Sequence, residues 1–299
     1  MLTSEFIKEK ARELGATICG IGRVYDEPDM QRDPKMILPD AKCIIGFGFA
    51  VPKALYKTME TKSQYYTYTN IGVKYIDEEM AEIFLLKIGA IIENHGYDAC
   101  LQKSTPGLRV KGDTATNPEV RDTYALISDP VEEGKPAPDV IIDFGKAAEV
   151  CGLGSVGLHG KVIAPKYGSF MRWVFIITDM PLETDAPFEG ALCDGCGKCL
   201  SACPGRAIDP NTGVDSWQCS VYYRGAHKSN PFMTDDFLKH HPEREAILDG
   251  EKRFDAESAK ALFPSLKFLP NTHLGYVACL CGKACEVACY KHLKEEGKL

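Results

Sequence analysis

The chain has 299 residues, of which 44% are hydrophobic and 26% are charged, and its formal net charge is −7. This length allows one large domain with a smaller one beside it, and the composition is that of an ordinary globular protein. The acidic balance argues against a broad nucleic-acid-binding surface, and no apolar run is long enough to cross a membrane. We therefore expect neither nucleic acid nor a membrane as a partner.

The N-terminal segment, residues 1–14, predicts an amphipathic helix. Phe6, Ala11 and Leu14 lie near helical spacing, and Gly15 is suited to cap the helix end. The segment has neither the apolar core nor the cleavage site of a signal peptide. We therefore expect a cytoplasmic protein, whose cysteines stay reduced in that compartment.

Alternating strands and helices are predicted for the first part of the chain. Four apolar runs have the length of buried strands, at residues 16–22, 43–51, 139–144 and 170–178. The clearest helix is expected at residues 77–95. Its apolar stripe is formed by Met80, Phe84, Ile88 and Ile91, and Gly96 lies just beyond its end.

Residues 103–138 carry five prolines among many charges and predict a long excursion from the core. Loops of this length are often lids or binding loops. We expect this excursion to form part of a substrate pocket wall.

A glycine-rich motif, GLGSVG, occupies residues 152–157. It fits the G-x-G-x-x-G pattern of dinucleotide-binding proteins, but that fingerprint follows a strand and opens a helix. Here it follows a predicted short helix, and Pro165 and several glycines prevent a long helix after it. Two interpretations remain: a structural turn, and a backbone cradle for a bulky cofactor.

Cysteine spacing gives the strongest chemical signal in the chain. Cys193, Cys196, Cys199 and Cys203 follow the C-x2-C-x2-C-x3-C-P pattern of bacterial ferredoxins, which bind iron–sulfur clusters. In such a run the fourth cysteine ligates the other cluster of a pair, so the pattern predicts a second set of thiols.

The second set comes from a more irregular part of the sequence. Two clusters need eight ligands, and nine candidates are present, so we expect Cys279 to be spare. The predicted ligands of the first cluster are Cys193, Cys196, Cys199 and Cys289. Those of the second are Cys203, Cys219, Cys281 and Cys285.

Two other uses of these thiols fit less well. Zinc needs only four ligands and prefers paired C-x2-C knuckles, and disulfides would require export. The remaining cysteines stand alone in apolar surroundings, which predicts buried and inert thiols. They are Cys19, Cys43, Cys100 and Cys151.

The stretch at residues 147–205 resembles the core signature of the epoxyqueuosine reductase and reductive dehalogenase family. The shared features are an alanine-rich helix, G-L-G-x-x-G, a Tyr-Gly turn, a D-x-P-L segment and the ferredoxin run. "APKYG" and "TDMPLETD" are nearer to the dehalogenases, whereas the strands predicted near the N-terminus resemble epoxyqueuosine reductases. The resemblance spans most of the chain.

The resemblance implies an α+β protein with two parts. Residues 1–188 would form a nitroreductase-like domain that binds cobalamin and substrate, and residues 189–299 a ferredoxin-like module with two [4Fe–4S] clusters. The predicted cofactor contacts are Gly152, Leu153, Gly154, Gly157, His159, Gly160 and Tyr167. FMN is the alternative cofactor of the first domain.

The sequence departs from the family pattern at positions that bear on catalysis. The Asp-Ser-x-Pro element of epoxyqueuosine reductases is missing, and only Asp139 and Asp143 stand in the corresponding region. Tyr290, where the family has proline, follows the last cysteine. Tyr75, just before the first long helix, matches a family tyrosine. We expect Tyr75 or Asp143 to supply a proton during catalysis.

Three functions are compatible with these patterns. The leading hypothesis is a cobalamin- and iron–sulfur-dependent reductase that removes oxygen or halogen from a small organic substrate and takes electrons from a low-potential ferredoxin or flavodoxin. The second is an electron-transfer or corrinoid-reducing accessory protein without a catalytic corrin. The third is a flavin-dependent reductase with a fused ferredoxin. The sequence leaves the oligomeric state open.

Overall fold

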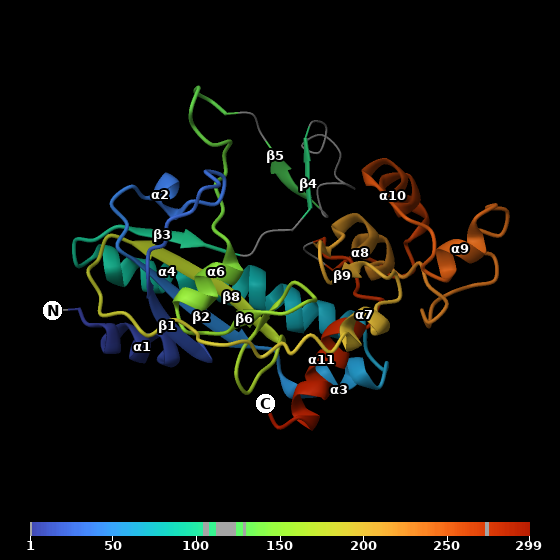
Figure 1. Cartoon of the computed structure of the whole chain (residues 1–299), viewed down its shortest axis with the longest axis horizontal. Helices are drawn as coiled ribbons and strands as arrows, with labels where there is room; N and C mark the ends of the chain where they lie inside the picture. Colours follow the sequence, from blue (N-terminus) through green and yellow to red (C-terminus); the bar gives the residue numbers. More distant parts are fainter. Residues whose placement is uncertain (1, 104–107, 112–123, 128–129, 273–274) are drawn as a thin grey trace.

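A computed structural model of the chain describes most of its residues (Figure 1). The described ranges are 2–103, 108–111, 124–127, 130–272 and 275–299. The α+β architecture implied by the resemblance is confirmed: helices pack on both faces of a four-stranded antiparallel sheet, and further helices gather at one end of the molecule.

The central sheet has the strand order β1-β2-β8-β3, and each neighbouring pair is antiparallel. Its strands are β1 (Ile18–Arg23), β2 (Cys43–Ala50), β3 (Ala99–Gln102) and β8 (Met171–Thr178). The strands predicted at 16–22, 43–51 and 170–178 are therefore confirmed. Strand β3 was not predicted, because four residues are too few for a clear pattern.

Two helical layers cover the sheet (Figure 1). On one face, helices α1 (Ser4–Glu13) and α4 (Ala81–Glu93) share a hydrophobic cluster with Ile45 and Phe47. On the other, helix α6 (Phe144–Val150) shares a second cluster with Ile44. Because successive residues of a strand point to opposite faces, the apolar run of β2 fills both layers.

Two glycines of β1 allow α6 to lie directly on the sheet. A Cβ atom on Gly20 would stand 2.0 Å from the carbonyl oxygen of Cys151, and one on Gly22 would stand 2.5 Å from that of Val150. No side chain fits in this space, so the backbone at the end of α6 contacts the strand itself. This contact positions the glycine-rich motif that follows.

The helix predicted at 77–95 begins earlier than expected. A π-helix, η1 (Tyr68–Met80), continues directly into α4, so Tyr75 lies within a helix and not just before one. Phe84 and Ile88 are buried as predicted, but Met80 is 39% exposed. In α4 the buried residue near the helix end is Ile92 rather than the predicted Ile91.

The strand predicted at 139–144 is wrong. Residues 139–143 are irregular, and Asp143 caps the start of α6. The amide of Gln31 replaces a neighbouring strand: its Nε2 donates to the carbonyl oxygens of Ala137 at 2.5 Å and Asp139 at 3.3 Å. The backbone is thus satisfied by one side chain, which the apolar pattern could not reveal.

The excursion predicted at 103–138 contains two short parallel strands, β4 (Leu108–Lys111) and β5 (Tyr124–Ile127). Most of its other residues lie outside the described part of the chain. A cavity of about 660 Å³ is lined in part by residues of this excursion, including Lys103, Glu132 and Pro138, and in part by residues outside it, including Leu101. Its role as a pocket wall stays a prediction.

The last hundred residues form short helices, and those between residues 216 and 262 share a hydrophobic cluster of their own, which includes Tyr222, Phe254 and Leu262. The helices are α7 (Lys198–Ala202), α8 (Ser216–Tyr223), α9 (Arg244–Leu248), α10 (Ala256–Leu262) and α11 (Ala284–Glu295). Helix α11 packs against α7 and against α3 (Lys53–Glu60) of the first part. The domain boundary at 188/189 stays a prediction.

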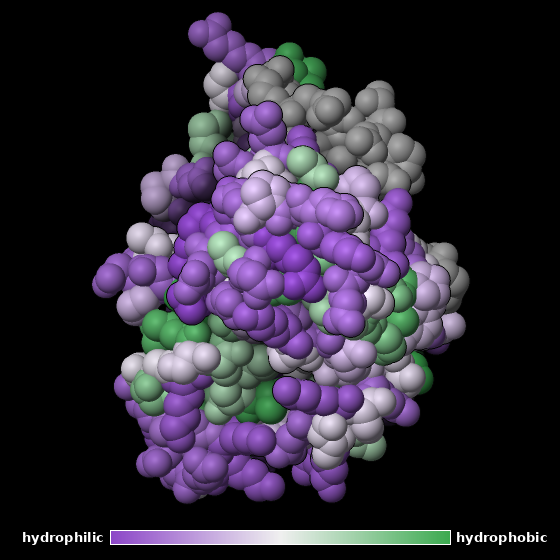
Figure 2. Space-filling model, turned by 90° about the vertical axis from the view of Figure 1, so that its right-hand side faces the viewer, coloured by the Kyte–Doolittle hydropathy of each residue, from purple (hydrophilic) through white to green (hydrophobic). Residues whose placement is uncertain are grey.

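Smaller elements complete the fold. They are α2 (Pro34–Ile37), the 3₁₀-helix η3 (Phe263–Ser265), the hairpin of β6 (Ser155–Val156) and β7 (Val162–Ile163), and the hairpin of β9 (Ile208–Asp209) and β10 (Gly213–Val214). None of the described helices combines the length and the apolar character needed to cross a bilayer. The face in Figure 2 is mainly hydrophilic, with hydrophobic residues showing in a band across its lower half.

The contact between α6 and β1 gives a stability prediction. Gly20→Ala should lower the free energy of unfolding by about 2 kcal/mol or more, because its methyl group must displace a backbone carbonyl. Gly96→Ala is the control, since no atom lies within 4 Å of that position and only its positive φ opposes alanine, at about 1 kcal/mol. Thermal unfolding measures both, and an equal loss of stability would contradict the close contact.

Candidate iron–sulfur and cofactor site

The first predicted thiol set surrounds one cavity. Cys193, Cys196, Cys199 and Cys289 all line it. Gly195 and Gly197 precede α7 with φ of +74° and +70°, a conformation that glycine adopts without strain and that turns the chain around this space. The fourth thiol comes from α11, which packs against α7. Residues almost one hundred positions apart are thus gathered at one point.

The protonation behaviour of Cys289 reflects this gathering. Burial, followed by the neighbouring Cys193, Cys199 and Cys196, raises the pKa of Cys289 to about 12. Thiolates held this close repel one another unless a cation lies between them. A cation that binds four thiolates would therefore relieve the repulsion, as an iron–sulfur cluster does.

The second predicted set also comes together. Burial, then the nearby thiol of Cys281, raises the pKa of Cys219 to about 12, and Cys203 contributes to the same shift. Cys285 has both Cys281 and Cys219 among the groups that raise its pKa after burial and Glu286. The backbone N–H of Ala207 donates to the Cys203 sulfur at 3.3 Å.

Cys279 lies beside the second set but in a different environment. Its sulfur is 3.7 Å from that of Cys281, and its backbone N–H donates to Thr69 Oγ1 at 2.8 Å. It is fully buried in the main hydrophobic cluster. Its assignment as the spare cysteine stays a prediction, as do the eight ligands.

The other four cysteines differ in burial. Cys43 and Cys151 are buried, and their thiols donate to the carbonyl oxygens of Leu182 and Ile44. Cys19 and Cys100 are only half-buried, so the prediction of full burial is wrong for these two. Burial raises the pKa of all four thiols, which makes them unreactive. None of the thirteen cysteines forms a disulfide.

The glycine-rich motif follows α6 and leads into the β6–β7 hairpin, so it lacks the strand-to-helix setting of a dinucleotide site. A Cβ on Gly154 would stand 2.2 Å from the Ile163 carbonyl oxygen, and one on Gly152 would stand 2.6 Å from that of Ala186. Contacts within the chain therefore account for these glycines. This geometry favours the structural-turn interpretation at both positions.

The remaining predicted cofactor contacts have mixed positions. Leu153 is 5% exposed and belongs to the cluster beneath α6. A Cβ on Gly157 would stand 2.7 Å from a methyl group of Ile163. Gly160 is exposed, and Tyr167 is half-buried. Their proposed contacts with a cofactor stay predictions.

Three buried polar atoms near this motif have no hydrogen-bond partner among the described residues. They are Ser155 Oγ, His159 Nε2 and Ser169 Oγ. Such atoms are rare in folded proteins and mark places where a bound group can supply the missing partner. They lie within fifteen residues of one another, next to the hairpin.

His159 connects the motif with the first thiol set, because it lines the same cavity as the cysteines. Burial lowers the pKa of His159, so the ring is neutral at pH 7. Its Nδ1 accepts from the Lys161 backbone N–H at 3.2 Å, which leaves the proton on Nε2. The unpartnered Nε2–H is therefore a free donor at this cavity.

A group of charged side chains near the thiols was not predicted. Arg172 donates to the Gly72 carbonyl oxygen at 3.0 Å and to the Tyr68 hydroxyl at 3.1 Å. Lys283 lies 2.6 Å from Glu286. Two sequence features could have indicated this charged group. One is an arginine inside a buried strand, and the other is a lysine and a glutamate among clustered cysteines.

Lys161 belongs to the same charged region. It makes no ion pair with any residue of the described ranges, and its side chain is reached by solvent. Even so, the surrounding protein and then the ammonium of Lys283 lower the pKa of Lys161. An anionic group bound beside this cation would be stabilised by its charge.

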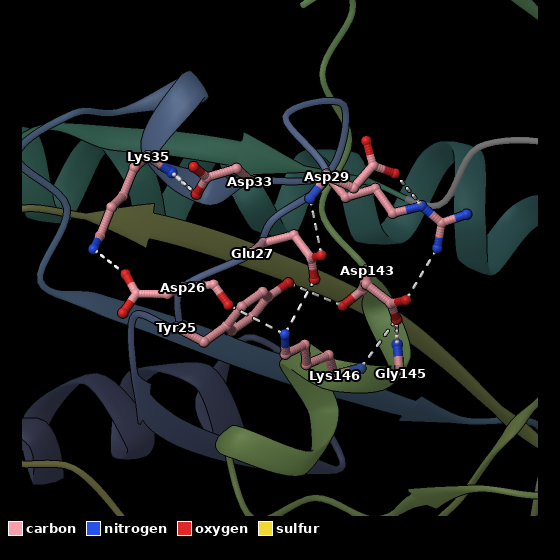
Figure 3. Close-up of polar contacts among 10 residues, drawn as sticks. Tyr25, Asp26, Glu27, Asp29, Asp33, Lys35, Asp143, Gly145 and Lys146 are labelled. Carbon is pink, nitrogen blue, oxygen red and sulfur yellow. Dashed lines mark hydrogen bonds and ion pairs between the residues drawn. The ribbon is translucent and has the colours of Figure 1, made fainter.

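The two predicted proton donors have different surroundings. Asp143 Oδ1 accepts from the backbone N–H groups of Gly145 and Lys146, and Oδ2 lies 3.0 Å from Arg32 (Figure 3). Both carboxylate oxygens are thus engaged in capping α6 and in an ion pair. Tyr75 lies on η1, is 38% exposed, and has the Lys74 ammonium 4.4 Å from its ring centre. The catalytic role of both residues stays a prediction.

Comparisons with known proteins give the following relatives. No family model matches the chain. An epoxyqueuosine reductase from Bacillus subtilis is 24% identical over 219 residues, which is 71% of this chain and 47% of that protein. The catabolic reductive dehalogenase NpRdhA, with 3-bromo-4-hydroxybenzoic acid, superposes over 98% of this chain and 36% of its own, at 17% identity and a TM-score of 0.53. A solved epoxyqueuosine reductase with a tRNA stem loop superposes over 98% of this chain and 82% of its own, at 17% identity and a TM-score of 0.47.

The chain spans about half the length of the curated relatives that it matches. The resemblance predicted from the motifs is confirmed, since the sequence relatives are named epoxyqueuosine reductases and the dehalogenase has the same fold.

The two thiol sets give a prediction about metal content. Cys281→Ser should lower the iron bound per chain by about half, because it removes one ligand of the second set. Cys279→Ser should leave the iron unchanged, since the matched thiol two residues away is expected to be spare. Iron and sulfide analysis of both anaerobically purified variants measures this. The opposite pair of results would exchange the two assignments.

Proposed function

We propose that this chain, which belongs to the structural family of epoxyqueuosine reductases and reductive dehalogenases, is an oxidoreductase that uses two [4Fe–4S] clusters and cobalamin. Its reaction is the reductive removal of oxygen or halogen from a small organic substrate. Residues 1–188 hold the corrin and the substrate in a nitroreductase-like domain, and residues 189–299 hold the clusters. Electrons come from a low-potential ferredoxin or flavodoxin.

The gathering of eight thiols into two groups carries this proposal. The first group shares one cavity, and in the second group Cys281 lies close to both Cys219 and Cys285. A zinc site would leave half of these thiols unused, whereas two cubanes use all eight. The residues present therefore fit the clusters, which would pass single electrons.

The fit for a corrin depends on the polar groups near the hairpin. Ser155 and Ser169 offer buried hydroxyls without partners, and His159 offers a free Nε2–H. These are suitable contacts for the amide-rich edge of a large ring. When bound, cobalamin would supply the reducing power at cobalt that breaks the bond to oxygen or halogen.

The chain's own residues would handle charge and protons. Lys161 and Lys283 lie near the second thiol set, where cations offset the negative charge of a cluster. Tyr75 is the better placed of the two proton donors, because it is partly exposed and its hydroxyl can donate a proton. Asp143 would first have to give up its ion pair with Arg32.

A small substrate agrees with the acidity of the chain and with the 660 Å³ cavity, which has the size of typical small-molecule sites. The epoxyqueuosine reductase solved with a tRNA stem loop makes tRNA the competing substrate. Binding to tRNA would fall steeply as salt increases, because several phosphates must be neutralised. We expect no tight, salt-sensitive binding of a tRNA stem loop in a filter or polarisation assay.

The cofactors are tested on anaerobically purified and reconstituted protein. We expect about eight iron and eight sulfide per chain and, after addition of cobalamin, a bound corrin visible in the absorption spectrum. Iron near four, or zinc in its place, would contradict two clusters. Clusters without a bound corrin would favour the accessory protein, and bound FMN would favour the flavin-dependent reductase.

The proton donor is tested by substitution. Tyr75→Phe should lower turnover by a factor of about 100 or more while both cofactors stay bound, because it removes only the hydroxyl. Asp143→Asn should instead leave turnover almost unchanged and lower the thermal stability only slightly, because asparagine still caps α6 and only the ion pair with Arg32 is lost. If Asp143→Asn alone abolished turnover in stable protein, the roles would be reversed.

A further inference from the structure

A cavity of about 290 Å³ opens between α3 and α11, beside the second thiol set. We propose that it is the docking site of a small acidic electron-transfer protein. This inference rests on the function proposed above, because it assigns the entry point of the electrons to one surface of the molecule.

The position of the cavity is the first argument. Its wall includes Cys281 and Pro204, the residue after Cys203. The other thiols of the second set, Cys203, Cys219 and Cys285, do not line it. The cavity therefore reaches the second set from outside and is separate from the space between the four sulfurs. Electron transfer slows steeply with distance, so a carrier seated here would deliver electrons to that set over a short path.

The lining of the cavity has the character of a protein interface. Met59, Leu280 and Val287 form an apolar centre, and the ring of Tyr65 contacts that of Phe232, which is 40% exposed. Transient interfaces combine such an apolar centre with a charged rim. An apolar centre of this size gives short-lived binding, as an electron carrier that must leave again requires.

The rim is basic. Lys62 and Lys291 line the cavity, and so does Glu60, whose charge is paired with Lys291 at 2.9 Å. Lys57 precedes Glu60 by one turn of α3, and Lys294 follows Lys291 by one turn of α11, so both lie on the same helix faces as the cavity.

Three of these lysines have no carboxylate partner. Lys57, Lys62 and Lys294 are exposed and form no ion pair within the described parts of the chain. In a protein of net charge −7, this local excess of positive charge favours an acidic partner.

Each encounter transfers one electron and makes or breaks no covalent bond. The carrier would be oxidised by one electron, and a cluster held by the second thiol set would be reduced by one. Opposite charges would raise the association rate at low salt, and the gain would fade as ions screen it.

The experiment measures cluster reduction in the reconstituted protein by stopped-flow absorbance, with photoreduced flavodoxin as the acidic carrier. Dithionite, a small reductant that needs no docking surface, gives the reference. The variant Lys62→Glu/Lys294→Glu reverses one charge on each side of the cavity. The control Lys42→Glu/Lys87→Glu changes the net charge equally, and neither of its lysines lines the cavity. Lys42 stands at the far end of β2, roughly 25 Å away along the strand.

We expect the cavity variant to react about tenfold more slowly with flavodoxin at low salt, with the difference lost at high salt and dithionite reduction unchanged. The control should react as the wild type does. Equal rates for the cavity variant and the wild type, or equal slowing by the control, would overturn the docking site.

The outcome is also distinguishable from a failure of the proposed function. If the wild type held no iron and dithionite bleached nothing, the two-cluster function and the docking site would both fall. Iron is measured in every variant, and Lys57→Glu, a single exposed substitution on α3, replaces the double variant if the latter loses iron. With Lys57→Glu, unchanged flavodoxin kinetics would contradict the proposal.

Discussion

Both thiol sets depend on the packing of helix α11 against the first part of the chain. Cys285 and Cys289 are one turn apart on this helix and belong to different predicted sets. The next residue, Tyr290, places its ring centre 4.4 Å from that of Tyr56 and 5.8 Å from that of Phe170. These aromatic contacts stabilise the docking of α11, each by about 1 kcal/mol. Tyr290, which stands where the family pattern has proline, thus holds α11 against the first part of the chain.

The same helix brings charge into the interior. Glu286 is buried, and although burial opposes its ionisation, Lys283 and then Lys161 and Arg172 lower the pKa of Glu286 to about 2. The carboxylate is therefore ionised at neutral pH, and Lys283 lies 2.6 Å away. Breaking such a buried pair is costly, since it leaves one charge without a partner. A network of this kind fixes the first turn of α11 and, with it, the position of Cys285.

The sequence predicted the parts of the fold that follow from local patterns. Continuous apolar runs identified β1, β2 and β8, and cysteine spacing indicated which thiols would meet. It did not predict interactions between distant residues, such as the Gln31 amide that replaces a strand beside Asp139. The π-helix at Tyr68–Met80 was also missed, because it changes the helical period on which the pattern depends. The buried charges were overlooked because their partners come from other elements.

The glycine-rich motif can be interpreted only when the sequence pattern and the contacts in the structure are considered together. The sequence left a structural turn and a cofactor cradle as alternatives, and the contact of Gly154 with the Ile163 carbonyl favours the turn. The turn nevertheless brings His159, with its free Nε2–H, to the first thiol cavity. Because contacts within the chain hold the hairpin in shape, they also orient this donor. Preorganised donors lose little entropy on binding, so the hairpin can serve a cofactor without its glycines touching one.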